Sequence, residues 1–270
     1  MNLLVMGLIV AGAATAGIGV MYAVRRRANV DEFLTDTTRG SAIFGVIGTA
    51  FAVLLAFVMF VAFESFNEAR DAAEAEAAEV KNLFHSASFL PAEDRDELQG
   101  ELNCYGRAVV HQEWEAMRSG DDAPGVELWI DEFEGTLRGI HPESITEQNG
   151  YRQLFVEDAA REEARRERTL ESEAVVSAPV WFIIGLAGLA TVGFVVLFTD
   201  RREAFFVQAS MIAGVAGLVT ASLLLVWFLD HPYQDAAGSI EPVEMERTIA
   251  DMEREAPGVT PPCAKDGEPI

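Results

Sequence analysis

One side of the second long apolar segment carries the residues whose spacing could support ion chemistry. Apolar residues recur there at steps of three or four and are followed by two carboxylates: Val53, Phe57, Phe60, Glu64 and Glu68. In a helix this spacing places the side chains on one face. If several copies met along this face, the apolar groups would form a constriction and the carboxylates an acidic mouth, which are common means of gating and filtering ions. Alternatively, the phenylalanines face lipid or the core of one protomer.

The sequence lacks the motifs of common catalytic sites. It contains no glycine-rich phosphate loop, serine nucleophile elbow, Cys-x-x-Cys pair or HExxH helix. The nearest approach to a metal site is His111 with Glu113 and Glu115, but zinc needs three or four ligands and the other histidines form no second cluster. We therefore expect no catalytic residue, no metal and no cofactor, and an enzyme is the least expected class.

Four long apolar segments must position the candidate residues. All 43 acidic and 20 basic residues lie outside four runs, at 1–24, 40–63, 174–199 and 204–229. A helix needs about 20 apolar residues to cross the roughly 30 Å hydrocarbon core of a bilayer, and each run is longer. The sequence predicts a membrane protein with four transmembrane helices and excludes a soluble enzyme, a secreted disulfide scaffold and a disordered chain.

The remaining residues form four polar segments, at 25–39, 64–173, 200–203 and 230–270. The first and third are short loops, the second is a long acidic domain, and the last is an acidic tail. The long domain has 28 acidic and 11 basic residues and the tail has 10 and 3, which accounts for most of the net charge of −23. Such surfaces repel nucleic acid and anionic headgroups, so we expect no nucleic-acid partner.

Arginines beside the apolar segments indicate the orientation in the membrane. The two short loops hold six of them, whereas none precedes the first segment: Arg25, Arg26, Arg27, Arg39, Arg201 and Arg202. Basic short loops remain in the cytoplasm, so the long domain, the tail and both termini of this multi-pass plasma-membrane protein are predicted to lie outside it. Four arginines before the third segment, at 161–168, favour the opposite orientation. Because the first arginines follow their apolar run, it is predicted to be a retained transmembrane helix rather than a signal peptide.

The two cysteines, Cys104 and Cys263, lie in the long domain and the tail, on the same side of the membrane in any four-span topology. They could form a disulfide if that side is oxidising. Two unrelated thiols are the alternative, and the sequence leaves both open.

Helical periodicity continues from the second apolar segment into the acidic domain. Small and apolar residues recur at steps of three and four as far as Ala87, which predicts one helix over about 41–89. Pro91 ends this helix and opens the next. Further apolar stripes predict helices throughout the domain and one in the tail near 241–255, with no strand. The tail is predicted to be flexible after about 257.

Small residues four positions apart in the apolar segments allow helices to approach closely in lipid. They are Ala13 and Gly17, Ser210 and Gly214, and Ala213 and Gly217. Packing within one protomer is the first interpretation, and contact between copies is the second.

Longer stretches resemble a known family. They are GVIGTAFAVLLAFVMFVAFESFNEARDAAEAEAAEVKNLF, followed by LP and CYGRAVVHQEWEAM, and LDHPYQDAAGSIEP after the last apolar segment. Over about 41–242 the chain resembles the bestrophin-like family of bacterial membrane proteins (DUF4239), and HQEWEAM is the most specific part. More distantly it is similar to bestrophin ion channels, in which an acidic turn follows the last span. Asp230, Pro232 and Tyr233 match that turn, with Tyr233 in place of Phe.

The resemblance implies an all-α, bestrophin-like protomer with four transmembrane helices, the second and third extended into a helical aqueous domain. It also implies a homo-oligomer, a pentamer, around a pore lined by the second helix, with the lipid bilayer and inorganic ions as partners. Because an acidic vestibule attracts cations, we expect monovalent cations rather than the chloride carried by the animal family. The alternative is a non-conducting, membrane-anchored helical protein that binds a partner or acts as a sensor. Bestrophins hold the long helical part in the cytoplasm, whereas the arginines here favour the outside.

Overall fold

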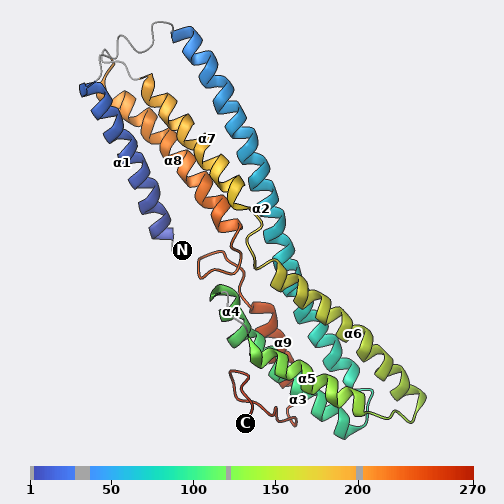
Figure 1. Ribbon diagram of the computed structural model, residues 1–270. Helices are drawn as coiled ribbons and strands as arrows, with labels where there is room; N and C mark the ends of the chain where they lie inside the picture. The colour runs from blue at the N-terminus through green and yellow to red at the C-terminus, as the bar shows by residue number, and fades with distance from the viewer. Residues whose placement is uncertain (1–2, 28–36, 120–122, 199–202) are drawn as a thin grey trace. The chain divides into compact units, whose positions relative to one another are not determined.

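The computed structural model describes residues 3–27, 37–119, 123–198 and 203–270. These residues form helices without a β-strand (Figure 1), in the order α1 (Leu3–Arg27), α2 (Thr37–Ala87), α3 (Ala92–Ala108), η2 (Val109–Glu113), α4 (Trp114–Ser119), α5 (Pro124–Gly139), α6 (Ile145–Leu170), α7 (Ala178–Leu197), α8 (Phe205–Leu229) and α9 (Val243–Glu255). The prediction of an all-α fold is confirmed.

Four of these helices are long and apolar enough to cross a membrane. The candidate spans are Leu3–Arg26 in α1, Gly40–Ala87 in α2, Ala178–Leu197 in α7 and Phe205–Leu229 in α8. Each of them overlaps one of the four predicted apolar segments, and the second extends beyond its segment to Ala87. Arg201 and Arg202, two of the arginines behind the predicted orientation, lie outside the described residues, as do residues 28–36 of the first predicted loop.

The second helix continues well beyond its apolar part, as its periodicity predicts. It is one α-helix of 51 residues. Just after its end, the N–H of Ser88 donates a hydrogen bond to the carbonyl of His85, and the N–H of Leu90 donates to the carbonyl of Ala87. Pro91 then forms the amino-terminal cap of α3, whose first turn carries two acidic residues. Proline lacks an N–H and its φ suits a helix start, which explains why the chain stops and restarts here.

The chain divides into two compact units. The first comprises Met1–Phe66, Ala174–His231 and Asp235–Gly238, and the second comprises Asn67–Glu173, Pro232–Gln234 and Ser239–Ile270. The first unit therefore holds α1, the apolar part of α2, α7 and α8. The second holds the acidic domain and most of the tail.

In the first unit, α7 and α8 lie side by side, and α1 packs against α8 (Figure 1). One apolar core joins α2 to α7 and α8, with Val58, Ala62, Val176, Ile184, Val226 and Leu229 buried in it. A second core forms between α1, α7 and α8 around Met21, Val196, Ala209 and Ile212. Because lipid is as apolar as these side chains, close packing rather than water exclusion must hold the helices together.

Small residues make the approach of α1 to α8 possible. A β-carbon added to Gly17 would lie 3.1 Å from Cγ2 of Ile212, and one added to Gly217 would lie 3.6 Å from Cγ1 of Val10. A β-carbon on Gly214 would meet no described atom within 4 Å. Gly17 and Gly217 therefore serve packing within one protomer, which is the first of the two interpretations.

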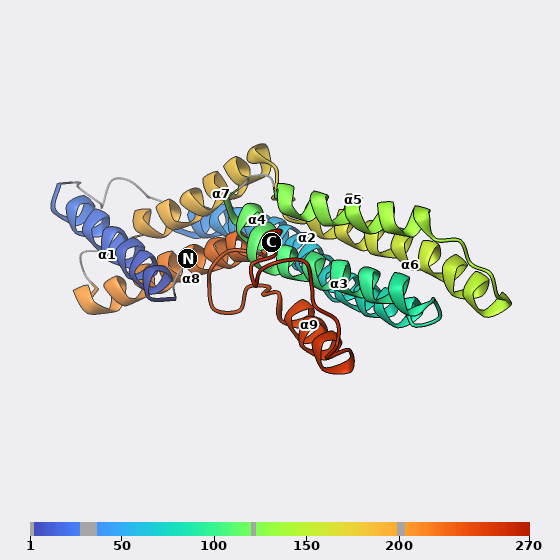
Figure 2. The same cartoon turned by 90° about the horizontal axis from the view of Figure 1, so that it is seen from below.

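The second unit is a helical bundle. Helix α3 lies against α5 and α9 (Figure 2), and α6 meets the last part of α2 through the pair of Arg168 with Glu76. Its interior holds leucines at positions 83, 98, 102, 137 and 154, each at most 1% exposed. Helix α6 starts with a capping box, because Ser144 accepts the N–H of Glu147 and the Glu147 carboxylate accepts the N–H of Ser144.

The end of the tail, which the sequence predicts to be flexible, forms hydrogen bonds and close contacts in the structure. The indole Nε1 of Trp129 donates to the carbonyl of Gly267 at 2.6 Å, and the N–H of Ile270 donates to the carbonyl of Pro262 at 3.1 Å. Gly267 has φ +85°, and a β-carbon there would lie 2.5 Å from the backbone nitrogen of Ala108. The composition of the tail does not reveal the contacts of Gly267, because Trp129 and Ala108 lie far away from it in the sequence.

The glycine contact between α1 and α8 leads to a stability prediction. Gly17→Leu should lower the free energy of unfolding by about 1–3 kcal/mol, because the new side chain overpacks the interface with Ile212. The readout is thermal unfolding in detergent. Gly12→Leu on the same helix is the control, since a β-carbon at Gly12 meets nothing within 4 Å. Equal losses in both variants would contradict the assigned packing.

Candidate functional site

The predicted pore residues lie on an exposed face of α2. Val53, Phe57 and Phe60 are 59%, 71% and 62% exposed, whereas Val58 and Ala62 on the other side belong to the core of the first unit. Glu64 and Glu68 are also exposed. The helix thus separates a packed face from an unpacked face that carries all five candidates: Val53, Phe57, Phe60, Glu64 and Glu68.

A broad apolar groove runs along this exposed face. It has a volume of about 880 Å³ and is lined by Ala42, Gly45, Val46, Thr49, Ala50, Val53, Leu54 and Phe57. Small side chains line its first two turns and larger ones follow. A surface on which small residues lie next to the bulky ring of Phe57 allows another helix to approach closely in lipid.

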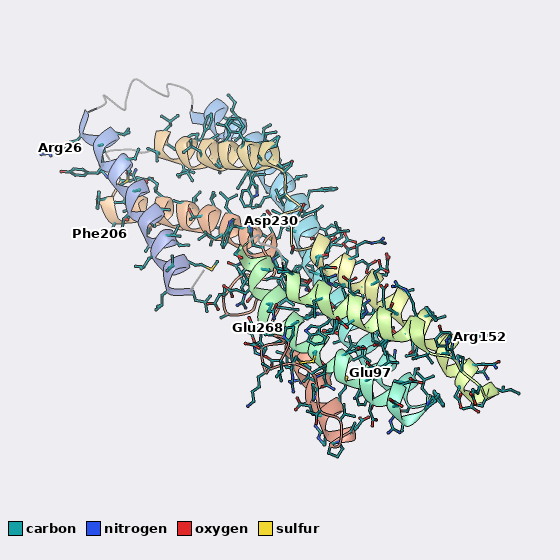
Figure 3. All side chains as sticks on the ribbon, turned by 60° about the horizontal axis from the view of Figure 1, so that its bottom comes forward. Arg26, Glu97, Arg152, Phe206, Asp230 and Glu268 are labelled. Atoms are coloured by element: carbon teal, nitrogen blue, oxygen red, sulfur yellow. A yellow bond between two sulfur atoms is a disulfide. The ribbon has the colours of Figure 1, made fainter. Side chains whose placement is uncertain are left out.

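Asp230 ends α8 and ties it to the start of the third span. It is 2% exposed, and its Oδ1 accepts the N–H of Val176 at 2.8 Å while its Oδ2 accepts Nε1 of Trp181 at 3.2 Å. Figure 3 labels Asp230 at the end of α8. Both carboxylate oxygens are therefore used in holding two spans of the first unit together.

Pro232 and Tyr233 are bound within the second unit. The Tyr233 hydroxyl donates to the carbonyl of Ala69 at 2.8 Å, and its own carbonyl accepts Nε of Arg118 at 3.0 Å. The carbonyl of Pro232 accepts the N–H of Ile240 at 2.9 Å. Because burial raises the pKa of Tyr233, the hydroxyl stays a neutral donor at physiological pH. These contacts give the turn after the last span a structural role.

Cys104 and Cys263, which both lie in the second unit, are joined in a disulfide. Their Cα atoms are 5.7 Å apart although the residues are separated by 159 positions. Both side chains are buried. A bond that closes so long a loop restricts the unfolded chain and contributes about 2–5 kcal/mol to stability in the chain-entropy picture.

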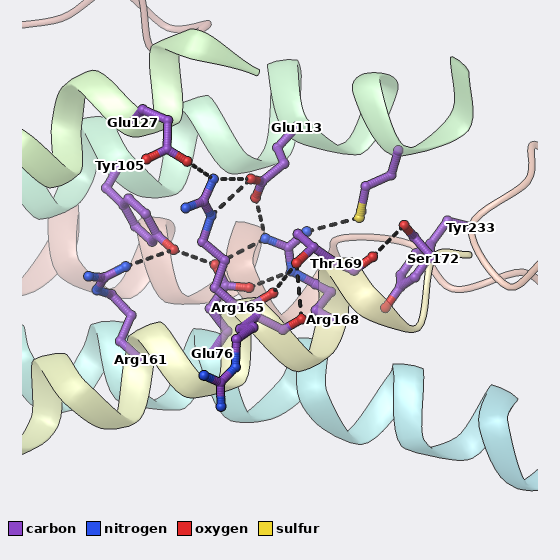
Figure 4. A network of polar contacts seen from close by, with 12 residues as sticks. Glu76, Tyr105, Glu113, Glu127, Arg161, Arg165, Arg168, Thr169, Ser172 and Tyr233 are labelled. Carbon is purple, nitrogen blue, oxygen red and sulfur yellow. Dashed lines mark hydrogen bonds and ion pairs between the residues drawn. The ribbon is translucent and has the colours of Figure 1, made fainter. Parts of the chain in front are cut away.

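The structure also contains a buried network of charges that the sequence analysis did not anticipate (Figure 4). Arg168 of α6 is fully buried and its guanidinium lies between Glu76 of α2 and Glu113 of η2. It donates to both oxygens of Glu76, with Nη2 3.1 Å from Oε1, and to Oε2 of Glu113. One guanidinium therefore links three helical segments.

Three further side chains extend this network. Arg165 donates to Oε1 of Glu113 from Nη2 at 2.6 Å and from Nε at 2.9 Å. The hydroxyl of Tyr105 donates to Oε1 of Glu76, and Arg161 lies with its guanidinium carbon 5.0 Å from the Tyr105 ring centre. Arg161 also pairs with Asp158, with Nη2 2.7 Å from Oδ1, so each of these buried charges has at least one opposite charge as a partner, which is what allows ionised groups to be buried.

A π-helical turn places Glu113 in the network. Residues Val109–Glu113 form η2, a widened turn between α3 and α4. Glu113, the last residue of η2, is 4% exposed, whereas His111 and Glu115 are exposed. Among the described residues, no group of three or more His, Cys, Asp or Glu side chains is arranged to hold a metal ion.

Electrostatics keep the network charged. Burial alone would raise the pKa of Glu113, but the positive charges of Arg168 and Arg165 outweigh burial and lower it. A carboxyl whose pKa is lower in the folded state stabilises the fold above its ordinary pKa, and this stabilisation is lost as the pH falls through the folded value. Burial, reinforced by the charge of Glu76, raises the pKa of Tyr105, so its hydroxyl remains protonated.

One sequence signal could have pointed to the network. Glu76 lies on the face of α2 that buries Ala69, Ala72 and Val80, and a carboxylate within a buried stripe requires a partner. Three arginines of α6, at 161, 165 and 168, share one face at steps of four and three. The spacing does not reveal which acids they meet, because these lie on other helices.

These features define an all-helical membrane protein with four spans, an extended second helix and a helical acidic domain. The sequence model of the bestrophin-like domain matches residues 8–243 of this chain, and the chain therefore belongs to the bestrophin-like family. The resemblance inferred from the sequence is confirmed.

Solved structures agree with this assignment. A crystal structure of a mutated bacterial bestrophin homologue from Klebsiella pneumoniae has a TM-score of 0.69 at 15% identity, covering 90% of this chain and 98% of that chain. Another structure of the Klebsiella homologue gives 0.63 at 16% identity, covering 92% and 97%. A crystal structure described only as a membrane protein gives 0.66 at 15% identity, covering 90% and 98%. No curated protein matches the chain. At identities this low, the structural similarity shows a shared fold and nothing more specific.

The buried network leads to a second prediction. Arg168→Met should lower the free energy of unfolding by about 3–5 kcal/mol, because Glu76 and Glu113 stay buried after losing their shared counter-charge. Thermal unfolding in detergent measures the loss. Arg166→Met is the matched control, because Arg166 is two residues away and pairs with Glu163 on the exposed surface of α6. A control loss as large as that of Arg168→Met would show that the buried pairs contribute no more than a surface pair.

Proposed function

We propose that this protein forms an oligomeric ion channel with a pore lined by α2. The observation that carries the proposal is the exposed face on which Val53, Phe57 and Phe60 are followed by Glu64 and Glu68. Apolar constrictions and carboxylate rings are recurrent elements of ion pores. Membership of the bestrophin-like family supports a channel over an enzyme.

The division of α2 into two faces supports an assembly around a central axis. Val58 and Ala62 are buried against α7 and α8, so the opposite face is the one available to other copies. Carboxylates that continue an apolar stripe are costly beside lipid but are well solvated at a pore mouth. We propose a homo-oligomer, a pentamer, in which the α2 helices of the copies meet.

The charge distribution favours monovalent cations. The segment 64–173 has 28 acidic and 11 basic residues, so its surface attracts cations and repels anions. Glu64 and Glu68 would extend this negative potential to the end of the apolar constriction. The ion pathway would therefore combine a cation-attracting entrance with a hydrophobic gate.

Bilayer recording tests the proposed gate. Phe57→Ala with Phe60→Ala should increase single-channel conductance, because the constriction widens and becomes easier to wet. Phe182→Ala on α7 is the control: Phe182 is 70% exposed but lies on another helix, and its loss should leave conductance unchanged.

The same preparation distinguishes the channel from a non-conducting anchor. Light scattering that subtracts the detergent should give the mass of a pentamer. A monomer, or the absence of current from both wild type and the double variant, would contradict the channel and favour a membrane-anchored interaction or sensor protein.

We further propose that the acidic domain of this multi-pass plasma-membrane protein lies outside the cytoplasm. The Cys104–Cys263 disulfide supports this orientation, because disulfides persist in oxidising compartments. The arginines of the two short loops support it independently, since basic short loops remain in the cytoplasm.

Cysteine labelling tests this orientation. In intact spheroplasts, Glu163→Cys should react with a membrane-impermeant maleimide, because Glu163 is an exposed residue of the acidic domain. Ala204→Cys, before α8 and on the opposite side, should react only after permeabilisation. The reverse pattern would place the domain in the cytoplasm, as in bestrophins.

A further inference from the structure

A cavity in the second unit lies apart from the α2 face. It is open to one side, has a volume of about 500 Å³ and is bordered by α3, α5 and the end of the tail, with Asp96, Glu97, Glu101, Leu128, Trp129, Glu132, Thr260, Pro262 and Pro269 as its lining. This volume falls within the roughly 300–1,000 Å³ typical of small-molecule sites. Four of the lining residues are carboxylates and none of them is basic.

Glu101 is the unusual member of this lining. It is 5% exposed, and its Oε1 accepts the hydroxyl of Thr136 at 2.7 Å. Its Oε2 is buried and has no hydrogen-bond partner among the described residues. Burial raises the pKa of Glu101 to about 7; the Thr136 bond opposes the rise, and the charges of Glu97 and Glu132 add to it. A buried carboxylate that lacks a hydrogen-bond partner is energetically unfavourable, and a positively charged group bound beside it would stabilise it.

Apart from Thr260, the remaining lining residues of the cavity are largely apolar. Leu128, Pro262 and Pro269 lie beside Trp129, whose Nε1 is already bound to the carbonyl of Gly267. An aromatic ring attracts ammonium groups, and apolar walls pack against methylene chains. Glu97, labelled in Figure 3, adds a charge from the exposed surface of α3.

A metal ion fits this lining less well than an organic cation. Within the ranges that the structure describes, three or more potential ligand side chains nowhere gather closely enough to bind one metal. The carboxylates are instead spread over two helices around an apolar wall. Several positive charges joined by methylene groups match that distribution.

We propose that this cavity binds a linear aliphatic polyamine, with one ammonium group at Glu101 and others at the exposed carboxylates. The methylene segments would pack against Trp129 and the prolines. Such a ligand places a positive charge beside the Glu101 carboxylate and offsets the repulsion among the four carboxylates. The site does not depend on conduction and stands or falls separately from the proposed channel.

The disulfide holds in place the end of the tail, which forms one wall of this site. Thr260, Pro262 and Pro269 flank Cys263, which is bonded to Cys104 of α3. Reduction should therefore loosen the wall and weaken polyamine binding.

Calorimetry on the full-length protein in detergent tests the site with spermidine as the probe. Glu101→Gln should weaken binding at least tenfold, whereas Asp131→Asn, an exposed change of the same charge on α5 outside the cavity, should alter it less than twofold. Because an ammonium group favours the ionised carboxyl, wild type should release protons on binding near pH 7, and Glu101→Gln should not. Should Glu101→Gln fail to fold, the exposed pair Glu97→Gln with Glu132→Gln takes its place.

Three results would overturn the proposal. The first is the absence of saturable spermidine binding. The second is equal weakening by Glu101→Gln and Asp131→Asn, which would indicate diffuse attraction to an acidic surface. The third is tighter binding of Ca²⁺ than of spermidine with loss of Ca²⁺ binding in Glu101→Gln, which would indicate a metal site.

Weaker spermidine binding after reduction of the disulfide would support the tail as a wall of the site, and unchanged affinity would show that the tail is not part of it.

Discussion

The buried guanidinium of Arg168, held between Glu76 and Glu113, is the interaction on which the acidic domain depends. Removing three charges from water is costly, so they are stable only while all three segments keep their positions. Glu76 reaches this place because α2 continues as one helix beyond its apolar part. Glu113 reaches it through the π-helical turn η2. The network therefore selects one arrangement of α2, η2 and α6 within a domain rich in repelling carboxylates.

The two faces of α2 connect this fold to the proposed function. In the first unit, Val58 and Ala62 pack against neighbouring spans, whereas Val53, Phe57 and Phe60 remain exposed. One face of α2 thus completes the core of its own protomer. The other face stays apolar and exposed, as the proposed association of several copies requires. In a bilayer, helices associate through close packing rather than hydrophobic exclusion. The groove of small residues on α2 provides a surface suited to such packing.

The acidic composition has opposite consequences in different places. Where acids meet arginines, as at Glu113, the opposite charges lower the carboxyl pKa and hold the domain together. Where a buried acid lies near other acids, as at Glu101, burial and the neighbouring negative charges raise the pKa to about 7, and one oxygen has no hydrogen-bond partner among the described residues. The first arrangement contributes stability, and the second creates a site that a cation would complete. The disulfide holds the tail across that site.

The sequence by itself determined the helices and spans, because apolar runs, helical periodicity and proline are local signals. The length of α2, the restart after Pro91 and the family resemblance followed from these signals. Tertiary structure alone decided which acids pair with Arg168, where the π-helical turn falls, how Cys104 meets Cys263 and which path the tail follows. These features join residues far apart in the chain. Spacing along one helix specifies a face, but the partner of that face depends on how the helices pack.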